Sequence, residues 1–175
     1  YNRRKEIIYM KPSGVNLAET TEKDISSLRL SGEQISGKKP SVDTATHLEL
    51  YRMFKSVSCV VHTHSKYCTI FAQANKEIPC LGTTHADYFY GPVPCVDETD
   101  RNQTLVDYEK NTGANICSFF ESKGIDENYM RGCLVKGHGV FCWGPTIAKA
   151  LESALVIELI AEMAYKTLLL NGEIK

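Results

Sequence analysis

Short apolar runs alternate with longer segments of helical periodicity along this 175-residue chain. The run Val57–Thr63 reads as a buried strand. It lies between Thr44–Phe54, whose apolar residues recur near helical spacing, and a second helical stretch, Ser65–Asn75. Because strand and helix alternate, the pattern predicts a single α/β domain with a mostly antiparallel or mixed sheet flanked by helices. The connectivity of the strands does not follow from the pattern.

The remaining elements are expected from turn and cap signals. Residues 6–10 and Ser26–Leu30 read as two strands that form a small sheet edge. The rest of the chain is expected to contain a turn-rich aromatic segment at Thr84–Val93, a helix at Thr104–Lys123 interrupted at Gly113, a strand at Cys133–Lys136, and a long helix that starts at Gly144-Pro145 and stops at Asn171-Gly172.

The amino-acid composition excludes some classes of binding partner. The 20 Lys plus Arg balance 21 Asp plus Glu, a formal net charge of -1, so no basic field favours nucleic acid or an anionic membrane surface. The apolar stretch Ala148–Leu170 is interrupted by five charged residues, which excludes a membrane span. The seven cysteines are scattered without a C-x-x-C pair, which indicates a reduced cytoplasmic chain, and we assign none of them a role. The expected partner is a small molecule.

Three histidines have the residue type and spacing of metal ligands. In "VHTHSKYC", strand geometry directs His62 and His64 to the same face. His138 follows an apolar strand and lies between Gly137 and Gly139. Three imidazoles with an open position match a catalytic zinc site, although core or turn histidines are the alternative. Asp43 is the candidate fourth ligand, and it is also a candidate helix N-cap; the two roles are compatible.

Two turns and one aromatic segment carry further chemistry. "KPSG" at residues 11–14 and "KKPS" at 38–41 combine lysine, serine hydroxyl and open backbone N–H groups, which suits a phosphate monoester, although solvated turns are the alternative. "GTTHADYFYG" at residues 82–91 places Asp87 among tyrosines, where a carboxyl group can transfer protons. The alternative is an aromatic loop at a subunit contact with a solvated aspartate.

Taken in order, five motifs resemble the L-ribulose-5-phosphate 4-epimerases of the class II aldolase/epimerase superfamily: "KPSGV", "KKPSVDTATH", "VVHTHS", "GTTHADYFYG" and "GHGVFCWG". The match runs from Lys11 to the terminal helix. It implies a three-layer α/β/α fold with a central, largely antiparallel sheet, and a homotetramer with active sites at subunit interfaces. It also implies a zinc ion, replaceable by manganese, iron or cobalt, with the ligands Asp43, His62, His64 and His138.

The resemblance also implies roles around the metal. Asp87 matches the catalytic acid/base, donated into a neighbouring subunit's site, and Thr83 and Glu109 match positions near that interface. The implied reaction interconverts L-ribulose 5-phosphate and D-xylulose 5-phosphate by retro-aldol cleavage and re-formation of the C3–C4 bond. The positions implied to contact the substrate around its phosphate are Ser13, Gly14, Ser41 and Val42, with Lys11 close by.

Three features depart from the family pattern. Val42 stands where a serine is usual, the family's "GN" substrate loop would precede Tyr1, and the second acid/base is a tyrosine in a tail beyond Lys175. We therefore expect residues 1–175 to be a single domain without its N-terminal segment and C-terminal tail.

Two rival functions remain. Class II sugar-phosphate aldolases of the fuculose- or rhamnulose-phosphate type use similar histidines, but they carry glutamate where this chain has Asp43 and lack the "THADYFYG" stretch. Cytoskeletal relatives use the fold as a non-enzymatic oligomerisation or binding module, which can dispense with the metal ligands.

Overall fold

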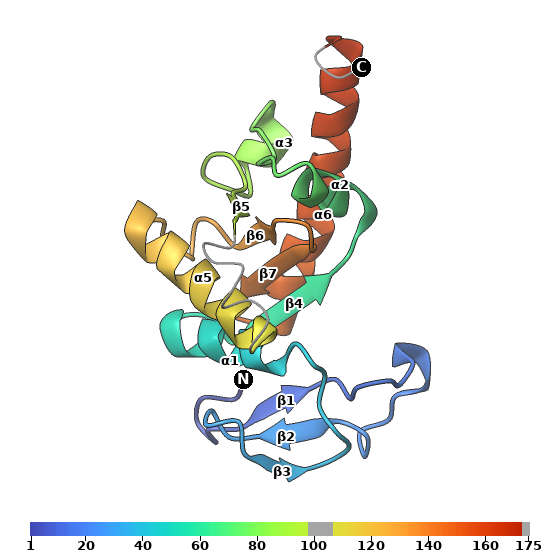
Figure 1. Ribbon diagram of the computed structural model, residues 1–175, viewed down its shortest axis with the longest axis vertical. Coiled ribbons are helices and arrows are strands. Elements are labelled where there is room, and N and C mark those ends of the chain that lie inside the picture. Colours follow the sequence, from blue (N-terminus) through green and yellow to red (C-terminus); the bar gives the residue numbers. More distant parts are fainter. Residues whose placement is uncertain (98–106, 173–175) are drawn as a thin grey trace.

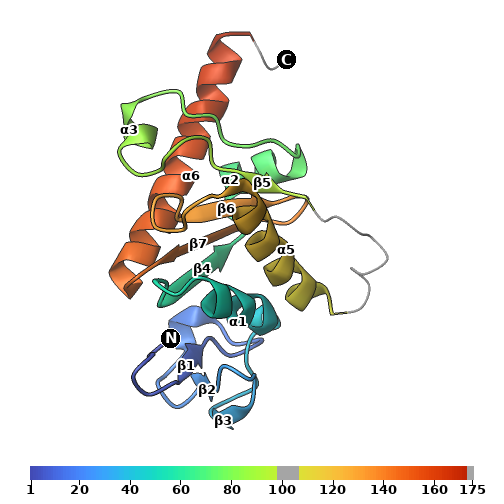
Figure 2. The ribbon, with the colours of Figure 1, turned by 90° about the vertical axis from the view of Figure 1, so that its left-hand side faces the viewer.

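The computed structural model describes residues 1–97 and 107–172, and a four-stranded sheet lies at its centre (Figure 1). The strand order is β4-β7-β6-β5, antiparallel except for the parallel pair β5 and β6. Helices cover both faces, which is clearest in Figure 2, so the predicted three-layer α/β/α fold with a mixed, largely antiparallel sheet is confirmed. The strands are β4 (Cys59–Thr63), β5 (Cys95–Val96), β6 (Gly132–Val135) and β7 (Val140–Gly144).

Alternating side chains of β7 join the layers. Phe141 and Trp143 face α1 (Thr44–Met53) and α5 (Tyr108–Lys123), and the Trp143 ring centroid lies 5.0 Å from that of Phe54 and 5.3 Å from that of Phe120. The other face packs against α2 (Lys66–Gln73) and α6 (Ile147–Leu170). All five residues of β7 are buried, as expected for a strand covered on both faces. This double burial also removes the period-two alternation that would have identified β7 in the sequence.

The N-terminal strands form a separate sheet beneath α1 in Figure 1. It pairs β1 (Ile8–Met10), β2 (Ser26–Leu28) and β3 (Gln34–Ser36) antiparallel in that order. The expected small sheet edge is therefore an independent three-stranded sheet. Its third strand was not foreseen because every residue of β3 is exposed and carries no burial pattern.

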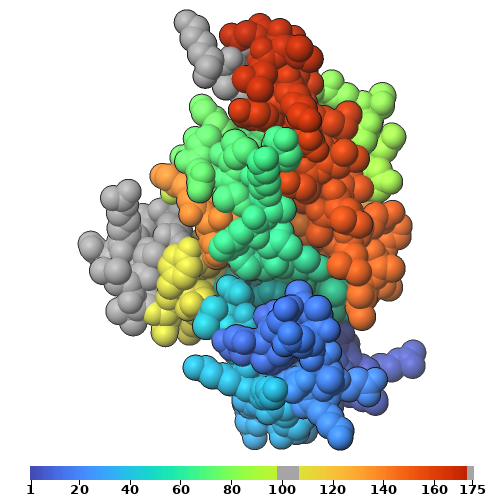
Figure 3. All heavy atoms as spheres, turned by 90° about the vertical axis from the view of Figure 1, so that its right-hand side faces the viewer, coloured from blue at the N-terminus to red at the C-terminus, as the bar shows by residue number. Residues whose placement is uncertain are grey.

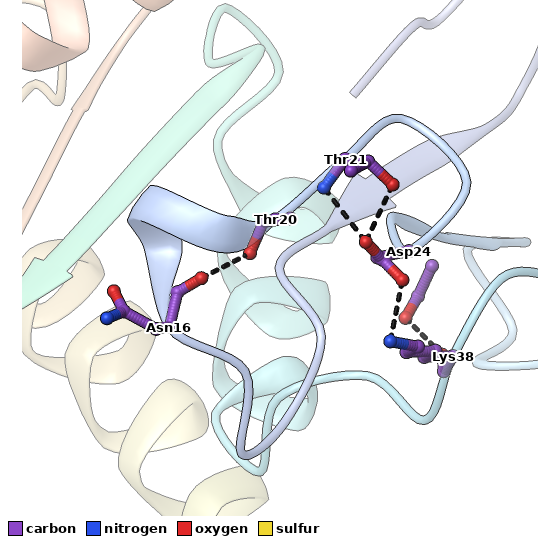
Figure 4. A network of polar contacts seen from close by, with 6 residues as sticks. Asn16, Thr20, Thr21, Asp24 and Lys38 are labelled. Carbon is purple, nitrogen blue, oxygen red and sulfur yellow. Dashed lines mark hydrogen bonds and ion pairs between the residues drawn. The ribbon is translucent and has the colours of Figure 1, made fainter.

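Figure 4 shows how the segment between the two Lys-Pro-Ser turns is held. Asp24 accepts hydrogen bonds from the Thr21 backbone N–H and hydroxyl, and it forms an ion pair of 2.7 Å with Lys38. The Lys38 ammonium holds the pKa of Asp24 below its ordinary range. Nearby, the Thr20 hydroxyl donates to the carbonyl of Asn16, at the start of the short 3-10 helix Leu17–Glu19. These contacts anchor the chain that leads into the second turn.

The helices differ from expectation at Gly113 and at the start of the terminal helix. Gly113 does not interrupt α5; it allows close approach to α1, since a Cβ there would lie 2.8 Å from Glu49 Cβ and 2.9 Å from the Thr46 carbonyl oxygen. Residues 104–106 of the predicted helix lie outside the described residues. The terminal helix ends at Asn171 as predicted, but it begins at Ile147, two residues after Pro145, because Gly144 still belongs to β7 and the Thr146 side chain caps the helix by accepting from the Lys149 N–H.

Two smaller points complete the fold. The predicted aromatic turn segment contains a short helix, α3 (Thr83–Ala86). Within residues 1–97 and 107–172, no helix combines the length and apolar character that crossing a bilayer would require.

Candidate metal centre

His62, His64 and His138 converge at one end of the central sheet. His62 lies in β4, His64 follows its last residue, and His138 lies on the turn between β6 and β7. The pairing of β4 with β7, which aligns His62 with Phe141, brings the turn to the strand. The ring centroids are 4.7 to 4.9 Å apart, and one ligand atom from each histidine lies within 4.8 Å of the others. This spacing allows one ion to contact all three.

The glycines around His138 are required by this geometry. A Cβ on Gly139 would lie 2.6 Å from the Thr63 carbonyl oxygen and 2.8 Å from His64 Cδ2. Gly137 has a φ of +67°, a conformation that most side chains resist. The "GHG" sequence therefore reflects a turn that closes directly against His64.

The orientation of the His62 ring is set by the backbone. Its Nδ1 lies 2.9 Å from the Val140 carbonyl oxygen, which can only accept, so Nδ1 carries the proton. Nε2 is left with its lone pair, 3.1 Å from Nε2 of His64, and the ring stacks on Phe141 at 4.0 Å. A carbonyl that fixes the tautomer in this way is typical of metal-binding histidines. The donor set fits a divalent cation.

The local electrostatics favour neutral imidazoles. Burial lowers the pKa of His62. Burial, reinforced by the neighbouring His62 and His64, lowers the pKa of His138 to about 4. Because a lowered histidine pKa keeps the ring unprotonated at neutral pH, His62 and His138 are in the protonation state that binds a metal.

Asp43 lies beside this cluster and outside its set of mutually close ligand atoms. It occupies the N-cap position of α1, but its side chain makes no capping hydrogen bond; instead it accepts from the Ser41 hydroxyl at 3.0 Å. Asp43 and His62 both line a cavity of about 400 Å³, together with Lys11, Ser41 and other residues. A ligand in this cavity would contact both the carboxylate and one histidine.

The two Lys-Pro-Ser turns lie side by side at the cavity. The Ser13 N–H donates to the Lys39 carbonyl oxygen, and the Ser41 N–H donates to the Lys11 carbonyl oxygen, both at 2.9 Å. Gly14 has a φ of +70° with open space around it, and the Val42 side chain is 62% exposed. The structure thus brings together all five residues that were expected around a phosphate.

Asp87 and Thr83 lie at α3, away from the three histidines. Asp87 is the exposed C-cap residue of α3, and its N–H donates to the Thr83 carbonyl oxygen. In Figure 1, α3 is at the end of the molecule opposite the small sheet. Glu109 is in the first turn of α5, where its carbonyl oxygen accepts from the Thr46 hydroxyl. One copy of the chain therefore does not bring Asp87 to the histidine cluster.

Two residues near the centre were not foreseen. His47, one turn after Asp43 on α1, lines the cavity, and burial, with a further contribution from His62, lowers its pKa to about 4. The Tyr108 hydroxyl lies 3.2 Å from Nδ1 of His138. The i, i+4 spacing from Asp43 could have indicated His47. Tyr108 gave no sequence signal, since only the fold brings it to His138.

Fold and site together define a class II aldolase-type protein. The family model described as "Class II Aldolase and Adducin N-terminal domain" matches residues 2–165, so the chain belongs to this family. One curated relative is the "Probable L-ribulose-5-phosphate 4-epimerase UlaF" of Mycoplasma pneumoniae. It is 39% identical over 174 residues, which cover 98% of this chain and 72% of that protein.

Solved structures agree on the fold. An L-fuculose 1-phosphate aldolase superposes with a TM-score of 0.78 at 20% identity, covering 95% of this chain and 73% of that one. The L-fuculose-1-phosphate aldolase of Thermus thermophilus gives 0.69 at 23% identity, with 97% and 80% covered. The resemblance seen in the motifs is thereby confirmed at the level of family and fold.

Proposed function

We propose that this chain is a metal-dependent epimerase that interconverts L-ribulose 5-phosphate and D-xylulose 5-phosphate. The observation that carries the proposal is the cluster of His62, His64 and His138, whose first member lines the cavity that also contains Lys11 and Ser41. The 39% identity to a probable epimerase over nearly the whole chain supports this reaction in particular.

The metal would be held by His62, His64 and His138, with Asp43 as the fourth ligand. Zinc suits three imidazoles and one carboxylate; manganese, iron or cobalt are the alternatives. When bound, such a cation acts as a Lewis acid toward the oxygens of the sugar. The carbonyl of Val140 and the turn glycines keep the imidazoles in place for this role.

The phosphate would be bound by the paired turns. The Ser13 hydroxyl and the backbone N–H groups of Gly14 and Val42 would supply neutral donors, and Lys11 would supply positive charge close by. The Ser41 hydroxyl would join them by turning away from Asp43, to which it donates in the free protein. Lys38 pairs with Asp24, whereas Lys11 lines the cavity. Holding the phosphate would tether the two-carbon aldehyde fragment after the C3–C4 bond breaks, so that the fragment can turn and recombine.

Proton transfer would require a second copy of the chain. Inversion at C4 by bond cleavage exposes both faces of an aldehyde, and Asp87 is the proposed acid/base on one face. Within one chain, Asp87 at the end of α3 lies away from His62 in β4. We therefore propose that a neighbouring subunit of a homotetramer supplies Asp87 across an interface near Thr83 and Glu109.

An exposed apolar stripe supports self-association. It runs along α6 at four-residue spacing, on a helix that forms an open face of the molecule in Figure 3. Every member is 46 to 74% exposed, which is unusual for a stripe of this length on a monomer. The residues of this α6 stripe are Ile147, Leu151, Leu155, Leu159 and Met163.

Two alternatives are less well supported. A sugar-phosphate aldolase would share the histidines. The two solved aldolases named above are 20% and 23% identical to this chain, and Asp43 and "THADYFYG" distinguish the epimerase type. A non-catalytic binding module would have no need for three converging imidazoles. A cytoplasmic location is proposed with the function, supported by seven cysteines that are all free thiols.

The test combines metal analysis with a product assay. The purified full-length protein is expected to contain a stoichiometric divalent metal, and with L-ribulose 5-phosphate it should form xylulose 5-phosphate. His62→Ala should lose both metal and activity. Asp87→Asn should keep the metal and lose roughly a hundredfold or more in kcat, within the usual range for general acid–base catalysis.

Asp97→Asn is the matched control, because Asp97 lies in an exposed ion pair with Lys136. Accumulation of free glycolaldehyde phosphate would favour the aldolase. A metal-free, fully active preparation would refute the metal site.

A further inference from the structure

We propose that Tyr108 is a positioning residue for His138: its hydroxyl, paired with the ring Nδ1, fixes the orientation of the imidazole toward the metal. The proposal rests on the metal site of the proposed function and deepens it. The Tyr108 Oη atom lies 3.2 Å from His138 Nδ1, and the two ring centroids are 5.8 Å apart. Nε2 of His138 is then the nitrogen available to a cation.

His138 needs such a partner more than His62 does. The ring of His62 is held by the Val140 carbonyl and stacked on Phe141, both within the central sheet. His138 lies on a turn between two glycines, and its backbone N–H bonds only locally, to the Val135 carbonyl oxygen. A hydroxyl on Nδ1 would supply for His138 the orientation that a backbone carbonyl supplies for His62.

Tyr108 is itself held by the packing of α5 on α1. Its carbonyl oxygen accepts from the Thr112 hydroxyl at 3.0 Å, and the next carbonyl, of Glu109, accepts from the Thr46 hydroxyl at 2.5 Å. Gly113 brings the two helices close enough for the Thr46 bond. Since α1 begins next to Asp43, one pair of helices places both the proposed carboxylate ligand and the tyrosine.

The test is zinc affinity, measured by competition with a chelator on the full-length protein. Tyr108→Phe keeps the ring and removes the hydroxyl. We expect its zinc affinity to fall by roughly 10- to 100-fold, the usual loss when an outer hydrogen-bond partner of a metal ligand is removed. The visible absorption of the cobalt-substituted protein should also change, because the geometry around the ion changes.

Tyr129→Phe is the matched control, since Tyr129 is 67% exposed and lies on the loop that precedes β6. Its affinity and cobalt spectrum should equal those of the unaltered protein. The metal-free Tyr108→Phe protein should unfold at the same urea concentration as the parent, which separates positioning from a general structural role. Should Tyr108→Phe fail to fold, Thr46→Val loosens the same support and should weaken zinc binding in the same direction.

The outcomes separate the two proposals. If the unaltered protein binds zinc and Tyr108→Phe has the same zinc affinity and the same cobalt spectrum, the role of Tyr108 is overturned. The proposed metal site is unaffected by that result. Failure of the unaltered protein to bind any divalent metal overturns both.

Discussion

At the scale of single residues, Gly139 limits the space beside the candidate metal centre. A methyl group at this position has no room, since it would lie 2.6 Å from a carbonyl oxygen and 2.8 Å from the His64 ring. We expect Gly139→Ala to displace the His64 ring, to weaken zinc binding at least tenfold, and to lower the free energy of unfolding by about 1–3 kcal/mol, the usual cost of overpacking. Zinc competition and urea titration measure the two effects.

Gly137→Asn is the control for that change. Gly137 lies in the same turn and has a left-handed backbone, but a Cβ there meets nothing within 4 Å, and asparagine tolerates this conformation well. Its zinc affinity should stay close to that of the parent. Equal losses in the two variants would mean that turn strain, rather than the contact with His64, explains the effect.

How far single residues could be predicted depends on whether their role is local. His62 and His64 follow from strand periodicity alone, since a two-residue spacing places both on one face. His138 was identified by its residue type and its glycines, without any indication of where its turn would lie. Tyr108 joins the centre only because α5 packs on α1 far along the chain, and no local pattern records that contact.

At the scale of elements, the contact between α1 and α5 depends on Gly113. Alanine is the better helix former by about 1 kcal/mol. A Cβ at Gly113, however, would press on Glu49 Cβ at 2.8 Å and on the Thr46 carbonyl. We expect Gly113→Ala to destabilise the protein by about 1–3 kcal/mol, because the cost of overpacking exceeds the gain in propensity. Urea unfolding measures the change.

Ser118→Ala on the exposed side of α5 is its control, and it should leave stability unchanged or slightly raised. A Gly113→Ala protein more stable than the parent would show that the two helices yield without cost.

Long elements with a clear hydrophobic pattern were predicted correctly, and short or unpatterned ones were missed. The long helix α6 and the main body of α1 follow from periodicity and caps. β5 has two residues, β3 is exposed throughout, and β7 is buried on both faces, so none of them shows the alternation that marks a strand. The expected break at Gly113 was wrong because glycine in a helix can serve close packing as well as termination.

At the scale of the whole molecule, the α6 stripe and the position of Asp87 both point to a partner copy in the proposed enzyme. Placing charge within the stripe should oppose association. We expect Leu155→Glu, at a residue that is 74% exposed, to shift the protein toward smaller species in sedimentation velocity and to reduce activity, with zinc still bound.

Ile35→Glu is the comparison, because Ile35 is also exposed, at 46%, but lies on β3 away from α6. It should sediment as the parent does. An unchanged oligomer in Leu155→Glu would assign the α6 stripe to another partner. Assembly could not have been derived from the residues alone, since exposure of α6 becomes visible only once the sheet has taken up the opposite face of the helix.

The strand order also gives the candidate metal centre a role in stability. Among the described strands, β4 lies at the rim of the central sheet and pairs only with β7. An ion bound by His62, His64 and His138 would link this edge strand to the turn that joins β6 and β7. Such a cross-link closes the long stretch of chain between His64 and His138 into a loop, which would restrict local unfolding of β4. An exposed edge strand can pair with the edge of another chain. A bound ion would thus reduce aggregation through β4, in addition to its proposed role in catalysis.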